Sequence, residues 1–401
     1  MRAALFAQRG LSLIELMVSV VISLLIMVAI LQLYLDISRT NDDMAQTNAQ
    51  IENGRFTIQL LQNDIAHAGF WGGYVPEFDD LTTSDTPVSV TAGDPPETVT
   101  LVQRTPRVVP DPCSQDSAAW SQDEKDALLG IPVQAFGAAL TDCSMTGKIS
   151  GTDVLVVRYA GLTPVAVSEL DCDDDPDTPA PSCSAFFQTT FCEDEMPAYR
   201  LDAVTVNSMH FKDCATPTNT TTADFHETAV RRLVSNIYWI KNVDGVPTLM
   251  RQEFGGDAQP LIEGVEAFRV ELGIDNFSKT GEAVDYSESV AFSGEDDRST
   301  PTNRGDGVPD TFVRCPAEGC TAEQLRNVVA VKLFVLVRSL RETPGYTDPK
   351  TYCLESPELD ADADCSGDAL FEPDASEKKF KRHLFSSTVR LANVAGRRET
   401  P

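Results

Sequence analysis

An apolar run close to the amino terminus constrains the fold of this chain more than any other feature of its sequence. Residues 11–35 are almost wholly apolar, and the main interruptions are Ser12, Glu15, Ser19, Ser23 and Gln32. Because a helix needs about 20 apolar residues to cross a bilayer, the run predicts a single membrane-spanning helix. Glu15 is exceptional within it, since insertion scales assign roughly 2.5–3.5 kcal/mol to an acid at the membrane centre. This carboxylate therefore indicates a functional group that needs a partner.

The ten residues before the run have the composition of a cytoplasmic leader. They include Arg2 and Arg9, contain no acid and end in Gly10. An ordinary secretory signal places its cleavage site after the apolar core, whereas here the glycine precedes the core. Cleavage after Gly10 would leave the apolar helix on the mature chain, and the basic leader predicts that the rest of the chain lies outside the cytoplasm. The alternative is an uncleaved signal anchor in which the glycine has no role.

The segment Gly10-Leu11-Ser12-Leu13-Ile14-Glu15-Leu16 resembles the class III signal of type IV prepilins and type II secretion pseudopilins. The resemblance implies that a prepilin peptidase cuts between Gly10 and Leu11 and methylates the new amino terminus. It also implies that Glu15 pairs with the terminal amine of a neighbouring subunit, which would offset the desolvation of both charges. Most members of this family have phenylalanine directly after the cleavage site, where this chain has Leu11.

The pattern of the following residues divides the chain into four parts. No proline occurs between Leu11 and Val75, so the helix can continue beyond the membrane. Past Asp36 the pattern becomes amphipathic, with apolar residues at helical spacing: Met44, Ile51, Ile58, Leu61, Ile65 and Ala68. The helix should end near the glycines of residues 69–73. We therefore expect a leader at 1–10, a transmembrane assembly half at 11–36, a periplasmic half at 37–75 and a β-rich globular domain at 76–401.

The globular part has the pattern of an antiparallel sheet protein. Apolar or alternating runs predict strands at residues 97–104, 153–159, 231–241, 246–254, 264–273, 327–340 and 380–391. Asp244-Gly245 between two of these runs indicates a hairpin. The polar stretches between strands read as surface loops, at residues 76–96, 105–125, 171–184, 213–227, 278–311 and 343–378. The expected fold class is α+β, with a long amino-terminal helix packed on a β-rich domain, the type IV pilin-like arrangement.

All ten cysteines lie beyond the apolar run: Cys113, Cys143, Cys172, Cys183, Cys192, Cys214, Cys315, Cys320, Cys353 and Cys365. An even number outside the cytoplasm predicts disulfides that pin the loops. The sequence leaves their pairing open. Pairing of neighbours gives the shortest loops: Cys113–Cys143, Cys172–Cys183, Cys192–Cys214, Cys315–Cys320 and Cys353–Cys365. A zinc site is the competing interpretation, but no CxxC pair or histidine-rich cluster supports it.

Charge excludes some functions and leaves others open. The formal net charge of −29 disfavours nucleic acid as a partner. Three acidic loops could bind calcium or simply be solvated, at residues 171–177, at 306–310 and around Asp360, Asp362 and Asp364. A basic cluster is either the solvent face of an edge strand or a docking patch for an acidic neighbour: Lys378, Lys379, Lys381, Arg382, His383, Arg390, Arg397 and Arg398. No recognised catalytic motif is present, so we expect no enzyme and no cofactor beyond calcium.

Segments of the globular part extend the resemblance to a subgroup. Leu261-Ile262-Glu263-Gly264-Val265-Glu266-Ala267-Phe268-Arg269-Val270, Val328-Val329-Ala330-Val331-Lys332-Leu333 and Phe385-Ser386-Ser387-Thr388-Val389-Arg390-Leu391-Ala392-Asn393 resemble the body of PilW-type minor pilins. The resemblance implies a membrane-anchored subunit that moves into the pilus tip region and helps prime assembly. It implies as partners other minor pilins, the major pilin, prepilin peptidase and a tip adhesin. Because Glu15 is retained, we expect a place just beneath the tip. The alternatives are the J-like minor pseudopilin of type II secretion and, from a different class, a signal-anchored periplasmic receptor or hydrolase.

Overall fold

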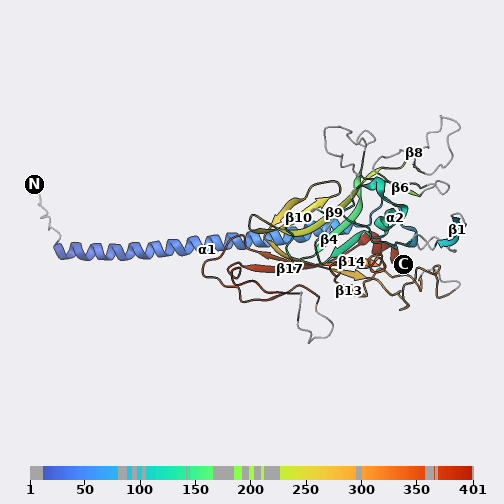
Figure 1. Ribbon diagram of the computed structural model, residues 1–401. Helices are drawn as coiled ribbons and strands as arrows, with labels where there is room; N and C mark the ends of the chain where they lie inside the picture. Colours follow the sequence, from blue (N-terminus) through green and yellow to red (C-terminus); the bar gives the residue numbers. More distant parts are fainter. Residues whose placement is uncertain are drawn as a thin grey trace, which may run out of the picture.

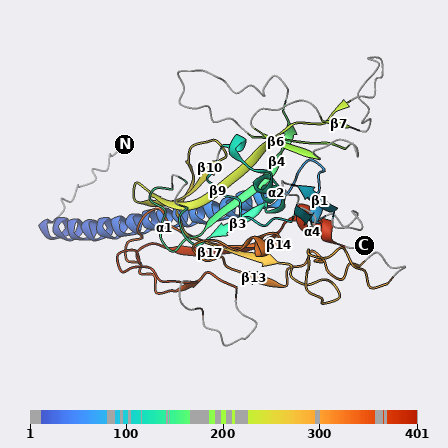
Figure 2. The same cartoon turned by 45° about the vertical axis from the view of Figure 1, so that its right-hand side comes forward.

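A long helix with its second half embedded in two antiparallel sheets forms the frame of the molecule. The computed structural model describes residues 12–79, 88–92, 97–101, 105–114, 116–140, 143, 145–165, 185–191, 198–202, 209–211, 226–294, 300–356, 365 and 369–399. Helix α1 runs from Leu13 to His67. Its first half projects away from the body, and the carboxyl terminus lies at the opposite end of the molecule (Figures 1 and 2).

Two larger sheets surround α1. The first has the strand order β11-β10-β9-β4-β3, with β5 and β6 attached beside β9, and the second has the order β13-β12-β14-β17. Their strands are β3 Val133–Phe136, β4 Val154–Pro164, β5 Phe186–Thr189, β6 Tyr199–Asp202, β9 Arg231–Val243, β10 Val246–Glu253, β11 Gln259–Glu263, β12 Val265–Ile274, β13 Thr311–Val313, β14 Val328–Arg338 and β17 Arg382–Arg390. Each pair of neighbouring strands in these sheets is antiparallel.

Short elements decorate this frame. Three two-stranded ribbons pair β1 Val88–Ala92 with β2 Glu97–Leu101, β7 His210–Phe211 with β8 His226–Glu227, and β15 Tyr352–Cys353 with β16 Leu370–Phe371. The helical pieces are η1 Glu77–Asp79, η2 Ser117–Ala119, α2 Gln122–Gly130, α3 Ala322–Leu325 and α4 Ala392–Arg398.

The predicted long strands are confirmed. β4, β9, β10, β12, β14 and β17 fall on the predicted runs within a few residues. The predicted hairpin joins β9 to β10, and both of its turn residues have positive φ, at 51° for Asp244 and 87° for Gly245. Positive φ at both positions is the type I′ geometry that matches the twist of the two strands. The α+β class follows directly from this arrangement.

The packed face of α1 begins later than its apolar pattern predicts. Met44 and Ile51 are 55% and 38% exposed. The buried residues are Gln50, Gly54, Thr57, Leu61, Asp64 and Ile65. Half of these are polar because they contact strand-end carbonyls and hydroxyl groups as well as apolar core. The helix also ends at His67 and does not extend to residue 75, since Gly69, Gly72 and Gly73 adopt positive φ and turn the chain.

Two predicted surface loops are mostly exposed, as expected, but they carry individual buried side chains that the sequence did not predict. Within residues 278–311 and 343–378, Tyr286 and Arg304 are each 3% exposed, and Asp348 is fully buried. These loops cover the face of the second sheet that carries charged side chains. As a result Glu266 and Glu271 of β12 are buried as well. The charges are paired, because Glu266 binds Arg382 and Glu271 accepts from the Ser356 N–H at 2.7 Å.

The structure contains three disulfides among the described cysteines. Cys113–Cys143, Cys315–Cys320 and Cys353–Cys365 each join neighbours in the sequence. Cys315 and Cys320 lie within the main hydrophobic core. The remaining four, Cys172, Cys183, Cys192 and Cys214, lie outside the described residues.

Gly54 marks the closest approach of α1 to the second sheet. A Cβ at this position would lie 2.0 Å from Cε2 of Phe385 in β17. We expect Gly54→Ala to destabilise the fold by about 1–3 kcal/mol, because overpacking outweighs the gain of roughly 1 kcal/mol in helix propensity. Denaturant unfolding of the detergent-solubilised chain measures the change. Gly396→Ala in α4 is the matched control, since nothing lies within 4 Å of its Cβ position, and a loss of stability limited to Gly396→Ala would contradict the prediction.

Candidate functional site

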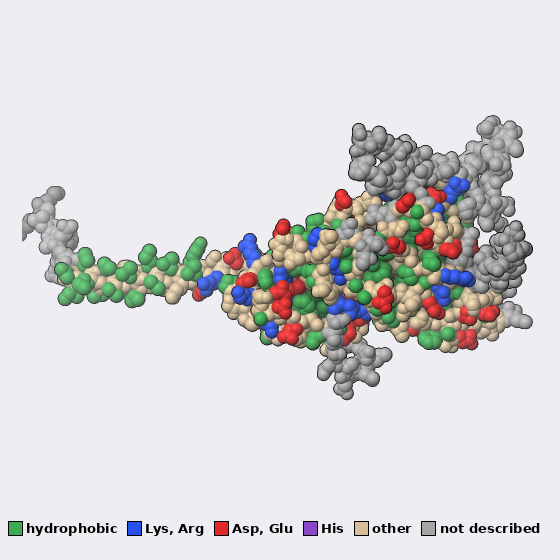
Figure 3. Space-filling view, viewed as in Figure 1, with side chains coloured by type: hydrophobic (Ala, Val, Ile, Leu, Met, Phe, Trp, Pro, Cys, Tyr) green, Lys and Arg blue, Asp and Glu red, His purple; other side chains and the backbone are tan. Residues whose placement is uncertain are grey.

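The exposed half of α1 carries most of the exposed large hydrophobic side chains among the described residues. Among the described residues α1 is the one helix that is long and apolar enough to cross a membrane, and none of its apolar window is buried within the molecule. Leu13 is 76% exposed and Leu25 is 65% exposed. Figure 3 shows this half as a continuous apolar rod beside the mixed surface of the body. Apolar surface of this extent requires lipid or other helices around it.

Glu15 lies at the beginning of α1, where it closes a capping box with Ser12. The Ser12 N–H donates to Glu15 Oε2 at 2.9 Å, and the Ser12 hydroxyl donates to the same oxygen at 3.0 Å. The Glu15 N–H donates to Ser12 Oγ at 3.2 Å. The first N–H groups of a helix have no partner within the helix, and inside a bilayer no water is present to bind them. The reciprocal pair supplies an acceptor for the N–H groups of Ser12 and Glu15. Gly10 and Leu11 lie outside the described residues.

Ser12 caps α1, a role that the sequence analysis did not identify. The pattern Ser-x-x-Glu before an apolar run is the sequence signal of a capping box and could have revealed it. The box fixes the Glu15 carboxylate at the first turn of the helix.

We expect Ser12→Ala to weaken this positioning. The substitution removes the side-chain cap, at a typical cost of about 1 kcal/mol, and frees the Glu15 carboxylate to rotate. Assembly should fall several-fold while cleavage after Gly10 continues. Immunoblots of membrane and sheared surface fractions measure both effects. Ser12→Thr keeps the cap and should restore assembly, whereas equal defects in Ser12→Ala and Ser12→Thr would contradict a capping role.

Asp64 attaches the other half of α1 to the first sheet. Its carboxylate accepts hydrogen bonds from the Tyr159 hydroxyl at 2.7 Å, the Tyr238 hydroxyl at 2.9 Å and the Asn236 amide at 2.8 Å. Burial and the neighbouring carboxylate raise the pKa of both tyrosines, so they remain donors at physiological pH. Asp64 itself is only 6% exposed. The helix is thus joined to β4 and β9 through one buried acceptor.

Other contacts attach α1 to the second sheet and to the carboxyl terminus. The Gln50 amide donates to the Val337 carbonyl at 2.6 Å, and the Gln62 amide donates to Ser387 Oγ at 2.6 Å. The Asn393 amide donates to the carbonyls at the end of α1, Ala66, His67 and Ala68. The bonds from Asn393 supply donors to the last carbonyl groups of the helix, which have no partner within it. The second half of α1 is therefore fixed to the body at several points.

Part of the basic cluster is exposed on or beside the edge strand β17, as the solvent-face interpretation predicts, and part of it is buried. Arg382 and Arg398 are buried and do not face solvent. Arg398 binds Asp79 at 2.8 Å and Asp275 at 3.3 Å. The remaining cations form ion pairs as follows: Lys378 with Glu372, Lys379 with Glu342, Lys381 with Asp43, Arg390 with Glu399 and Arg397 with Asp79. The partners of Lys381, Arg397 and Arg398 come from distant segments, so the sequence shows these charges but not their pairing.

The acidic loops offer no assembled metal site in the described part of the chain. The Asp310 carboxylate accepts from the N–H groups of Asn276 and Phe277, and Asp306 accepts from the Val308 N–H at 3.0 Å. These carboxylates therefore accept hydrogen bonds from the backbone of their own loops. Asp360, Asp362, Asp364 and residues 171–177 lie outside the described residues.

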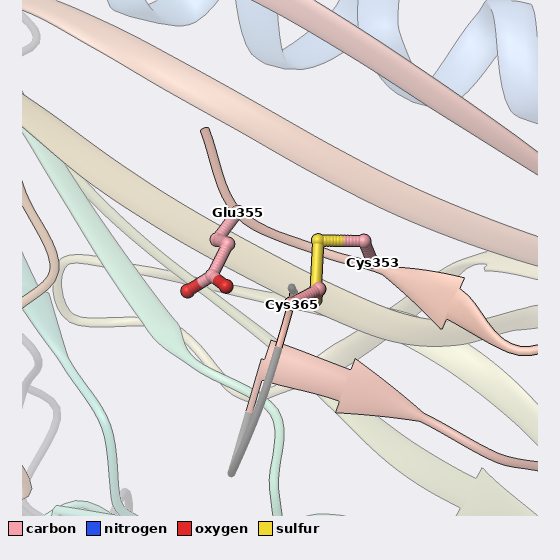
Figure 4. A group of neighbouring side chains, drawn as sticks. All are labelled: Cys353, Glu355 and Cys365. Carbon is pink, nitrogen blue, oxygen red and sulfur yellow. A yellow bond between two sulfur atoms is a disulfide. The ribbon is translucent and has the colours of Figure 1, made fainter. Parts of the chain in front are cut away.

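One group of side chains has metal-like spacing, formed by Cys353, Glu355 and Cys365 (Figure 4). One ligand atom from each lies within 4.8 Å of the others. The two sulfurs, however, are joined in a disulfide. Because metals bind the thiolate form of cysteine, this group provides one carboxylate and no sulfur ligand.

Comparisons with known proteins match both ends of the chain. Residues 237–393 match the family described as Type IV Pilus-assembly protein W, and residues 5–31 match the Prokaryotic N-terminal methylation motif. A type IV-like pilin from Thermus thermophilus is 12% identical, over 66% of this chain and 84% of that chain, with a TM-score of 0.24. No curated protein matches.

The match to the methylation motif includes Gly10, Leu11 and Glu15. The match to the pilus-assembly family begins within β9 and ends in α4. Together with the exposed apolar helix, these matches support a protein similar to the type IV pilins. Within this class the chain is PilW-like.

Proposed function

We propose that this chain is a non-catalytic minor pilin that helps prime assembly of a type IV pilus and forms part of its tip complex. The observation that carries the proposal is the helix α1, of which one half is wholly exposed and apolar and the other half is fixed to the body. The family match supports a role in type IV pilus assembly. Priming and the tip position go beyond that match.

The mechanism follows from the energetics of the exposed helix. Burying one large apolar side chain contributes roughly 1.5–3 kcal/mol, so the exposed half of α1 cannot leave the bilayer into water. It leaves when neighbouring pilin helices cover it, which couples extraction to bundling. Glu15 then meets the terminal amine of a neighbour, so that each charge has a partner inside the bundle. Retention of Glu15 supports a position beneath the tip and not at its end.

The proposed location has two stages. Before assembly the chain spans the inner membrane once, with its amino terminus on the cytoplasmic side and its body in the periplasm. Arg2 and Arg9 support this orientation, and the disulfides agree with an oxidising compartment. After processing by prepilin peptidase it joins other minor pilins and the major pilin, and it contacts a tip adhesin.

Deletion of the gene separates this function from the related one in secretion. We expect the deletion strain to lose surface pili and to secrete exoproteins normally. Complementation with the intact chain should restore piliation. Normal piliation with a loss of exoprotein secretion would instead identify a J-like minor pseudopilin of type II secretion.

A further inference from the structure

A polar pocket lies at the end of the body farthest from the start of α1. It encloses about 300 Å³ and is lined by three segments that are distant in sequence, represented by Arg107, Asp285, Ser287, Glu323 and Arg326. None of these residues belongs to the pilin signal or to α1. The pocket is therefore separate from the assembly surface described above.

Hydrogen bonds place this pocket at the distal end. Gln50, in the middle of α1, contacts Val337 at one end of β14, and Val337 pairs with Val265. The opposite ends of these strands, Val328 and Ile274, lie near α4, which caps the end of α1 through Asn393. Arg326 and the pocket residue Tyr286 adjoin that end, because Arg398 of α4 donates to the Arg326 carbonyl. In Figure 1 this region is at the carboxyl-terminal side, away from the exposed half of the helix.

The pocket floor is held in one conformation. Tyr286 is 3% exposed, and its hydroxyl donates to Asn327 Oδ1 at 2.9 Å. The guanidinium carbons of Arg304 and Arg326 each lie 5.0 Å from the centre of its ring. Ser287 donates to Asp285 Oδ1 through both its hydroxyl, at 2.5 Å, and its N–H, at 2.7 Å. Tyr286 and Arg304 therefore form a fixed base, while the side chains of Arg107, Asp285, Ser287 and Glu323 are exposed and accessible to a ligand.

The charges of the lining balance, which restricts the class of ligand. Arg107 and Arg326 are cationic, while Asp285 and Glu323 are anionic. The hydrogen bond from the Ser287 hydroxyl, and to a smaller extent the one from its N–H, lower the pKa of Asp285 below its ordinary value. This carboxylate is therefore ionised at neutral pH. The two carboxylates would repel an anionic ligand, and the two arginines would repel a cationic ligand. A neutral ligand with many hydroxyl groups can donate to the carboxylates and accept from the guanidinium groups at the same time.

We propose that this distal pocket binds a neutral saccharide unit. Its volume is at the small end of the range of ligand sites, about 300–1,000 Å³, and suits one or two sugar rings, so that the remaining ring of a trisaccharide would lie outside it. The hydroxyl groups of the sugar would donate to Asp285 and Glu323 and accept from Arg107 and from Arg326, which also pairs with Glu323 at 3.7 Å. Because the sites are separate, saccharide binding does not depend on the role of the chain in assembly.

The test uses the full mature chain in detergent and titrates it with neutral trisaccharides, maltotriose and chitotriose, and with the anionic sugar sialic acid. We expect saturable binding of a neutral trisaccharide that changes little between low and high salt, and no binding of sialic acid. Ser287→Trp places a large side chain in the pocket and should weaken binding by about tenfold or more. Ser289→Trp, in the same loop but outside the lining, is the matched control and should bind like the wild type.

Thermal unfolding of both variants shows whether either has lost its fold. Binding lost in Ser287→Trp, kept in Ser289→Trp and accompanied by equal melting temperatures would support the pocket. Three results would overturn the proposal: no saturable binding of either neutral trisaccharide, binding that survives Ser287→Trp, or preferential and salt-sensitive binding of sialic acid. The last result would point to a charged ligand.

Discussion

Glu15→Ala should leave cleavage after Gly10 intact and reduce assembly of this subunit by about a hundredfold. Removing one member of a buried charge pair typically costs 3–5 kcal/mol, because the other charge stays buried without a partner, and 1.4 kcal/mol corresponds to a factor of ten. Here the charge left behind would be the terminal amine of a neighbouring subunit. Loss of the carboxylate also removes the acceptor of the Ser12 N–H. Quantitative immunoblots of sheared pili against total membrane protein measure the ratio.

Ser19→Ala provides the control for Glu15→Ala. Ser19 is a polar residue on the same exposed half of the helix, and its hydroxyl donates only to the Leu16 carbonyl one turn earlier. Its replacement should assemble normally. Normal incorporation of Glu15→Ala, or failure of both variants, would rule out the specific pairing role of Glu15.

Asp64→Leu should cause the largest loss of fold stability, about 3 kcal/mol or more. The substitution keeps the approximate volume but leaves the Tyr159, Tyr238 and Asn236 donors buried without their acceptor. Each unsatisfied buried group costs roughly 1–3 kcal/mol. Trp71 and Trp239 are each 1% exposed, so their fluorescence during denaturant unfolding reports on the body.

Two variants test the specificity of the Asp64 effect. Asp64→Asn keeps one acceptor oxygen and should recover part of the stability. Glu52→Leu replaces an exposed acid of the same helix and should change the unfolding free energy by less than about 0.5 kcal/mol. If Asp64→Leu and Glu52→Leu were equally stable, Asp64 would not be the attachment point of α1.

The sequence predicts those features that depend on local pattern. The β-branched run of β14 and the Asp244-Gly245 turn carry their own signals, so their strands are found within a few residues. The apolar run of α1 and the position of Gly10 lead to the pilin class for the same reason, since each is a property of adjacent residues. Short strands such as β3 and β5 lack such a signal, because pairing with β4 and β9 stabilises them.

Long-range pairing explains what the sequence could not show. Glu266 and Arg382 are separated by 116 positions, and Asp64 and Tyr238 by 174. Burying these residues is favourable only in the folded chain, where each one binds its partner. From the sequence alone, a charged residue of this kind is therefore predicted to be exposed. Gly54 is similar: in the sequence it weakens a helix, whereas in the fold it makes room for Phe385. The Ser12–Glu15 box is different, because its signal is local and was present in the sequence.

Mass spectrometry of the mature amino terminus is the most direct test that this chain is a processed pilin. The chain should be purified from the membranes of a host that has prepilin peptidase. We predict that it begins at Leu11, lacks residues 1–10 and carries one methyl group on its terminal amine. A chain that retains Met1 in those membranes would contradict assignment as a pilin and would favour an uncleaved signal anchor.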